Sequence, residues 1–190
     1  MPNHTASPFS AGPLVLIGLI IAVALTRLIP HPPNFSPVEA MALFGGAYFA
    51  KRSWAVLVPL VALFISDLGL GLMMGGDYFQ YFVSAGFLLV YITIAALSLL
   101  GIGLRNKISV LRVAGYGIAG SVIFYLVTNF GVWFGSSFYS QTANGLIAAY
   151  VAGLPFLQNG VLGTLFYSAV LFGGYELLKQ RLPALANTRA

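Results

Sequence analysis

The stretch Arg27-Leu28-Ile29-Pro30-His31-Pro32-Pro33-Asn34-Phe35-Ser36-Pro37 separates two apolar runs of the chain. It holds four prolines in eight residues. Each proline lacks a backbone N–H and restricts the residue before it to extended conformations. The stretch therefore predicts a stiff, non-helical lid over residues 30–37, which brings the side chains of Arg27, His31 and Asn34 to the mouth of a helix bundle.

The composition indicates a membrane protein. Of the 190 residues, 59% are hydrophobic and 7% are charged, whereas an ordinary soluble domain has about 25% charged residues. The net charge of +5 comes from cations grouped at the ends of apolar segments. This pattern is typical of topological anchors and not of nucleic-acid binding. The absence of cysteine excludes disulfides and thiolate chemistry.

The apolar segments predict one all-α membrane domain, residues 1–190, with six transmembrane helices. A span needs about 20 apolar residues, fewer when the bilayer is locally thin. A short interfacial helix is expected at 143–151, and the first segment is expected to be retained, because no cleavage site for a signal peptide follows it. The predicted spans are 13–29, 38–50, 54–74, 81–104, 108–132 and 156–178.

The basic residues predict the orientation of these spans. The first, third and fifth connections carry one cation, Arg27. Because an excess of Lys and Arg marks the cytoplasmic side, the even connections and both termini are expected there. The cations of these regions are Lys51, Arg52, Arg105, Lys107, Arg112, Lys179, Arg181 and Arg189.

Most of the other polar residues are expected near the opposite, outer face. Asp67 follows Trp54 by 13 residues, which places it about 20 Å along the helix. By the same measure Asn129 lies at the outer end of its span. The predicted substrate-binding residues are Arg27, His31, Asn34, Asp67, Gln80, Tyr81, Asn129, Trp133, Tyr139, Gln158 and Asn159.

Two interpretations of the charged members remain open. An ionised group within a span must be paired or hydrated. Either Arg27 forms a salt bridge with Asp67 or Glu39 that fixes the first helix to the bundle, or these groups line a ligand cavity beneath the prolines. Ser36, Pro37 and Glu39 also match an N-terminal capping pattern for the second helix, which explains Glu39 without a ligand.

Small residues recur along one face of the first helix, at Gly18, Ala22 and Thr26. Such a face lets another helix approach closely. It is expected either to pack inside this bundle or to dock on a partner.

No enzyme motif is found. The sequence lacks a Walker A motif, a dinucleotide fingerprint, an HExxH pair and a GxSxG elbow. A serine hydrolase built on Ser136 or Ser137 is the remote alternative, since both histidines lie far back in the chain. No His, Asp and Glu residues have the spacing of metal ligands. We therefore expect no enzyme, no metal site and no intrinsic cofactor.

Several short stretches resemble one family. They are the run Ala42-Leu43-Phe44-Gly45-Gly46-Ala47-Tyr48-Phe49, the element Ser66-Asp67-Leu68-Gly69, the loop from His31 to Phe35 and the Thr-Asn-Phe-Gly-Val-Trp element from Thr128 to Trp133. Together they resemble the S components, the membrane substrate-binding subunits of energy-coupling-factor vitamin transporters. The resemblance is to a bacterial branch with a His-Pro-Pro-Asn-Phe loop.

The resemblance implies a multi-pass protein of the bacterial cytoplasmic (inner) membrane. It would capture a vitamin at the outer face and dock through its first helix on a transmembrane coupling subunit driven by cytoplasmic ATPases. Here Gly18, Ala22 and Thr26 replace the Ala-x-x-x-Ala face of that family. A cobalamin-binding type uses a cysteine; in this chain His31 is the candidate to replace it. The alternative is a structural or assembly subunit that binds partner helices without a ligand.

Overall fold

The computed structural model describes residues 11–82, 84–135, 137–182 and 185, and this part of the chain is helical, without strands. Short 3-10 turns follow the first helix and the helix that ends at Gly101, and a π-helical turn links the last two helices. The elements are α1 (Ala11–Leu25), η1 (Thr26–Leu28), α2 (Val38–Tyr48), α3 (Arg52–Met74), α4 (Gly76–Tyr81), α5 (Ala85–Gly101), η2 (Ile102–Leu104), α6 (Val110–Gly135), α7 (Ala143–Ser168), η3 (Ala169–Gly173) and α8 (Gly174–Arg181).

Four helical stretches are long and apolar enough to cross a membrane. They are Arg52–Met74, Ala85–Leu104, Val110–Gly135 and Ala143–Arg181. Gly12–Leu28 is a shorter apolar helix. Because a span needs about 20 residues at 1.5 Å each, the prediction of an all-helical membrane protein is supported.

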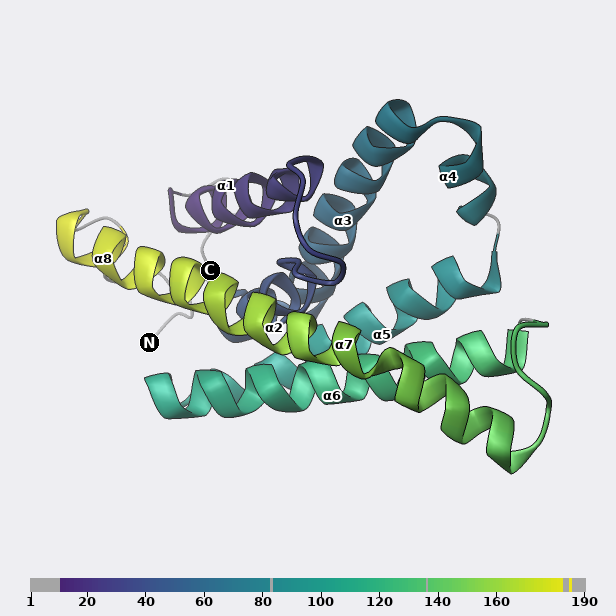
Figure 1. Ribbon diagram of the computed structural model, residues 1–190. Helices are drawn as coiled ribbons and strands as arrows, with labels where there is room; N and C mark the ends of the chain where they lie inside the picture. Colours follow the sequence, from purple (N-terminus) through teal and green to yellow (C-terminus); the bar gives the residue numbers. More distant parts are fainter. Residues whose placement is uncertain (1–10, 83, 136, 183–184, 186–190) are drawn as a thin grey trace.

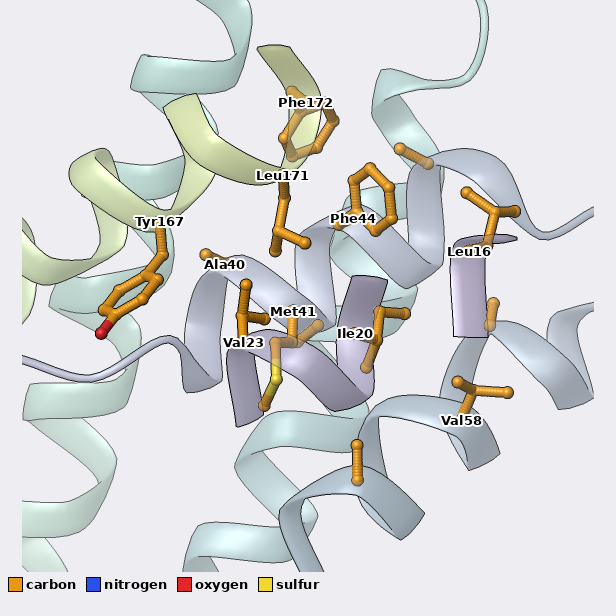
Figure 2. Packing of buried hydrophobic residues seen from close by; sticks show 14 of the residues in the cluster. Leu16, Ile20, Val23, Ala40, Met41, Phe44, Val58, Tyr167, Leu171 and Phe172 are labelled. Atoms are coloured by element: carbon orange, nitrogen blue, oxygen red, sulfur yellow. The ribbon is translucent and has the colours of Figure 1, made fainter. Parts of the chain in front are cut away.

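The short helix α2 lies among the others (Figure 1) and contacts α1, α3, α5, α6 and α7. Its residues from Val38 to Ala47 are all buried. With 11 residues it rises only about 17 Å. Segment 38–50 therefore forms the centre of the bundle. Figure 2 shows the α2 side chains of Ala40, Met41 and Phe44 packed between α1 and the turn η3 that follows α7.

Glycines bring the backbones of α2 and α5 into contact. A Cβ at Gly46 would meet the Ser98 carbonyl oxygen and the backbone of Gly101, and a Cβ at Gly101 would lie 2.5 Å from the Leu43 carbonyl oxygen. Arg105 then closes the end of α2, because its Nε donates to Gly46 O at 2.9 Å and its Nη2 to Phe49 O at 2.5 Å.

Two predicted helix starts are wrong. The fourth span was expected from residue 81, but Tyr81 ends α4 and α5 begins at Ala85, because the Ser84 side chain accepts the Phe87 N–H at 3.1 Å and caps the new helix. The sixth span was expected from residue 156, after a separate helix at 143–151. Instead one helix runs through both segments, and Pro155 lies inside it, since a proline removes a single backbone donor and can be accommodated in a long helix.

The basic residues meet at one end of the bundle, which we call the basic end. Arg105 binds the carbonyls that end α2, Arg112 Nη2 donates to Gly103 O at 2.8 Å, and Tyr48 donates to Glu176 at 2.8 Å. Lys179 forms a partly exposed ion pair with Glu176, at 2.9 Å. The basic end holds Lys51, Arg52, Arg105, Lys107, Arg112, Lys179 and Arg181, whereas Arg189 lies outside the described residues.

Candidate ligand-binding site

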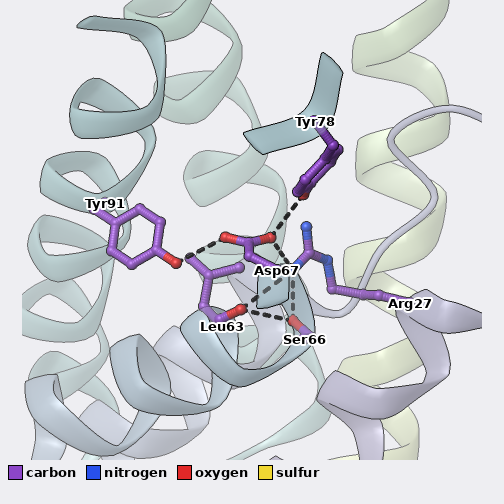
Figure 3. A network of polar contacts seen from close by, with 6 residues as sticks. All are labelled: Arg27, Leu63, Ser66, Asp67, Tyr78 and Tyr91. Carbon is purple, nitrogen blue, oxygen red and sulfur yellow. Dashed lines mark hydrogen bonds and ion pairs between the residues drawn. The ribbon is translucent and has the colours of Figure 1, made fainter. Parts of the chain in front are cut away.

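Asp67 is the centre of a buried polar network away from the basic end (Figure 3). Its side chain is almost inaccessible, although it lies in the apolar helix α3. Arg27 of η1 donates to Asp67 Oδ1 at 2.6 Å, Tyr78 of α4 donates to the same oxygen at 3.0 Å, and Tyr91 of α5 donates to Oδ2 at 2.7 Å. One carboxylate thus joins four elements, and charge-assisted bonds of this kind are the strong ones.

Arg27 has further partners on α3. Its Nη1 also donates to Ser66 Oγ at 2.5 Å, and Ser66 in turn donates to Leu63 O at 2.8 Å. The preceding residue, Thr26, donates to the Tyr167 hydroxyl of α7 at 2.9 Å. The predicted salt bridge is therefore confirmed, with Asp67 and not Glu39 as its partner.

This network forms part of the wall of a cavity of about 700 Å³. Pockets for small molecules commonly enclose about 300–1,000 Å³. The wall is mostly apolar and aromatic, and it comes from α3, α4, α5 and α6 together with residues 27–39. The aromatic and sulfur-containing residues of the cavity wall are Met73, Met74, Tyr78, Tyr81, Phe87, Tyr91 and Phe124. The sequence left open whether the charged residues form an ion pair or line a cavity, and in the structure they do both.

The Pro-rich segment, residues 30–37, forms the side of this cavity next to α7. It contains no helix, as its prolines predict. Asn159 of α7 donates to Pro33 O at 3.0 Å, and the Phe35 ring packs 5.8 Å from that of Phe166. A Cβ at Gly163 would lie 2.8 Å from Ser36 N. The segment is thus held against α7, and its tight turn places Asn34 in the left-handed region, with φ 62°.

The predicted capping pattern of α2 is wrong. Pro37 itself occupies the position before the helix, its carbonyl accepts the Met41 N–H at 2.8 Å, and no side chain caps the helix. Pro37 has nearly helical dihedral angles, so Ser36 lies one position too early to cap. Glu39 instead lines the cavity.

The predicted binding residues fall into three groups. Arg27, His31, Asn34, Asp67 and Tyr81 line the cavity. Asn129 lines an adjoining hollow with room for about one water molecule, where its side chain donates to Tyr125 O at 2.9 Å. The third group, Gln80, Trp133, Tyr139, Gln158 and Asn159, does not line the cavity.

Contacts within the protein account for two members of the third group. Trp133 donates through Nε1 to Ser140 O at 2.9 Å, which closes the loop after α6. Asn159 holds the Pro-rich segment. His31 does line the cavity but is exposed, and its Nδ1 lies 3.0 Å from Pro32 O.

Sequence reasoning missed the tyrosines that bind Asp67. Tyr78 and Tyr91 carry no charge and lie among other aromatic residues, so only the need of Asp67 for donors signalled them. Burial, together with the nearby Asp67 carboxylate, raises the pKa of Tyr78 to about 12. The Tyr78 hydroxyl therefore keeps its proton at neutral pH and remains a donor.

The three small residues predicted to form one face of the first helix lie in two different environments. Gly18 and Ala22 are exposed, and a Cβ at Gly18 would meet no atom within 4 Å. Thr26 instead turns into the bundle. Of the two serines proposed for hydrolysis, Ser136 lies outside the described residues and Ser137 is exposed. Within the described residues, no three His, Cys, Asp or Glu side chains cluster in a way that suits a metal ion.

A family model described as "Family of unknown function (DUF6580)" matches residues 8–185. The chain belongs to this family. No curated protein and no solved structure matches it. The match spans the cavity, the Asp67 network and the Pro-rich segment, so all three lie within the part of the chain that defines DUF6580.

Proposed function

We propose that this DUF6580 protein is a membrane substrate-binding protein, which captures a vitamin or a similar small cofactor at the outer face of the bacterial cytoplasmic membrane for uptake. The observation that carries the proposal is the cavity of about 700 Å³. Its mostly apolar wall, with a few fixed polar groups, has the composition of a small-molecule site. The Arg27–Asp67 pair would orient a ligand without itself needing to move.

The distribution of charge supports an outward-facing site. Seven cations meet at the basic end, whereas Arg27 is paired with Asp67 in the cavity wall toward the other end. The side of a membrane protein that is rich in Lys and Arg faces the cytoplasm. The proposal therefore includes cytoplasmic termini, six membrane-inserted segments with α2 as a short central one, and a cavity that opens outward.

The exposed positions Gly18 and Ala22 support docking on a partner. A Cβ at Gly18 would meet no described atom within 4 Å, so this face of α1 is open there. Small residues on such a face let a second helix approach closely. In the proposed function this partner is a transmembrane coupling subunit driven by cytoplasmic ATPases.

The same face favours a second candidate, a structural or assembly subunit without a ligand. Under that function, a bulky residue at Gly18 abolishes activity while changes in the cavity wall, such as Tyr81→Leu, are tolerated. Under the uptake function, both changes impair uptake.

The direct test is to purify the chain from a bacterial host grown in rich medium and to identify bound compounds by mass spectrometry. A stoichiometric compound is expected. A thermal-shift screen of vitamins is the second readout. The compound should be lost from Asp67→Ala and Tyr81→Leu and retained by Glu176→Gln, a change at the basic end. No bound compound and no stabilising vitamin would refute the proposal.

A further inference from the structure

Glu39 is the one acidic side chain of the cavity wall that lacks a partner side chain. It lies in the first turn of α2 with 4% of its surface exposed. Within the described residues it forms no salt bridge and accepts no hydrogen bond from a side chain, and the Arg27 guanidinium, which attracts it, lies beyond 4.0 Å. Glu39 lines both the main cavity and the hollow beside Asn129.

Asp67 provides the comparison within the same cavity. It is equally buried, but three side chains donate to it and the charge of Arg27 lies 2.6 Å away. A buried carboxylate without such donors is costly. Since Arg27 is already paired with Asp67, the formal charges of the wall leave one negative charge at Glu39 when His31 is neutral. A cation held in the cavity would therefore stabilise the ionised form of Glu39.

Aromatic rings line the same cavity as Glu39. Phe124 lines both hollows together with Glu39, and Phe87 and Tyr91 lie in the wall of the main cavity, where their ring centroids are 4.3 Å apart. A cation over the face of an aromatic ring is attracted by the ring quadrupole, and quaternary ammonium groups are bound in this way. A carboxylate and several rings in one cavity favour a ligand with a positively charged nitrogen.

The Glu39 carboxyl group lies between the two hollows. A Cβ at Gly160 of α7 would lie 3.9 Å from Glu39 Oε1, an ordinary contact distance, and Phe156, Leu157 and Gly160 of α7 line the smaller hollow with Glu39. Glu39 therefore packs against α7 on one side and lines the main cavity on the other.

We propose that the ligand of this cavity is an organic cation, whose protonated amine or alkylated nitrogen pairs with Glu39 and lies against the aromatic wall. This inference rests on the proposed capture function and names the chemical class of its substrate. It assigns to Glu39 a ligand-binding role that its position in the first turn of a helix does not suggest.

The test compares matched probes on the full chain in lipid nanodiscs. The probes are choline with its uncharged isostere 3,3-dimethylbutanol, and phenethylamine with 2-phenylethanol and the anion 3-phenylpropionate. Binding is measured by calorimetry and thermal shift. At least one cation is expected to bind about tenfold more tightly than its neutral partner, the factor that corresponds to about 1.4 kcal/mol.

The variants assign this preference to a residue. Glu39→Gln, which keeps the shape of the side chain, is expected to abolish the preference for the cation, while Glu39→Asp keeps part of it and the control Glu176→Gln keeps all of it. Phe124→Leu should weaken cation binding while the carboxylate remains. Far-UV circular dichroism and gel filtration of each variant establish that it folds.

Three results would overturn the inference: no cation binds, cation and isostere bind equally, or Glu39→Gln binds the cation as the unmodified chain does. A bound compound from the host that is uncharged or anionic would also overturn it while leaving capture intact. If no ligand of any class is found, the capture function itself fails, so the two failures are distinguishable.

Discussion

Arg27 Nη1 lies 2.6 Å from Asp67 Oδ1, and this ion pair joins the turn after α1 to the C-terminal half of α3. Both side chains are largely buried, with 14% and 4% of their surfaces exposed. The pair therefore has two roles at once. It fixes the first helical segment to the bundle, and it presents a charged, oriented surface to the cavity.

Breaking this pair from one side should strongly destabilise the fold. Arg27→Met or Asp67→Asn leaves a buried charge without its partner, which costs about 3–5 kcal/mol. The double variant should lose much less than the sum, because no charge then remains. Thermal unfolding in detergent measures each value. The matched control, Lys179→Met, breaks a partly exposed pair and should cost about 0–1 kcal/mol. Strictly additive losses at Arg27 and Asp67 would contradict the expected coupling.

Close packing of α2 on α5 gives a second prediction. Gly46→Ala or Gly101→Ala places a methyl group against backbone atoms, which cannot retreat as a flexible side chain can. The expected loss of stability is about 1–3 kcal/mol or more. Gly18→Ala is the control, since nothing lies within 4 Å of the added Cβ. It should be neutral or stabilise α1 by about 0.5–1 kcal/mol in thermal unfolding.

The fold could be predicted where composition decides it. Long apolar runs bounded by cations indicate membrane helices, and the four longest helices follow them. The helix boundaries that were predicted wrongly depend on local hydrogen bonding and on proline geometry, which a hydropathy pattern does not reveal. Ser84 starts a new helix inside an apolar run, and Pro155 is accepted within a helix that continues on both sides.

The site could be predicted where charge decides it. Arg27 and Asp67 lie in apolar surroundings and need partners, which is why their pairing was expected. Tyr91 and Phe124 lie on helices that are apolar on all sides, so the sequence does not show which of their residues point into the bundle. Glu39 matched a local capping pattern that explained it fully, and only the packing of α2 in the centre of the bundle reveals that the pattern is not used.

The Tyr78 hydroxyl predicts a dependence of stability on alkaline pH. Because the pKa of Tyr78 is raised to about 12 from about 10 in the unfolded chain, the folded state keeps this proton longer. Its contribution is present below pH 10 and is lost as the pH rises toward 12. The stability difference between the unmodified chain and Tyr78→Phe should be constant up to about pH 10 and shrink above it. An unchanged difference at pH 11.5 in thermal unfolding would show that the hydroxyl is not bonded to Asp67.

The exposed face of α1 predicts a separation of capture from transport. Gly18→Leu and Ala22→Leu should leave thermal stability and ligand binding unchanged, because both positions are exposed. Uptake by cells should fall about tenfold or more, since a bulky side chain keeps a partner helix away from a small-residue face. Leu14, which is also exposed on α1 but already large, supplies the control Leu14→Ile. Normal uptake in both leucine variants would mean that α1 docks on no partner through this face.

The anchor between Asn159 and the Pro-rich segment predicts a change in ligand exchange. Asn159→Ala removes the hydrogen bond to Pro33 O, which normally contributes about 0.5–1.5 kcal/mol. The segment should then open more often, so a captured ligand should dissociate about 2- to 10-fold faster with little change in the cavity itself. Stopped-flow exchange of the bound compound measures this rate. Gln158→Ala is a close control, because Gln158 is the preceding residue, is exposed and lies outside the cavity wall. If both variants exchange ligand at the rate of the unmodified chain, the ligand does not leave past this segment.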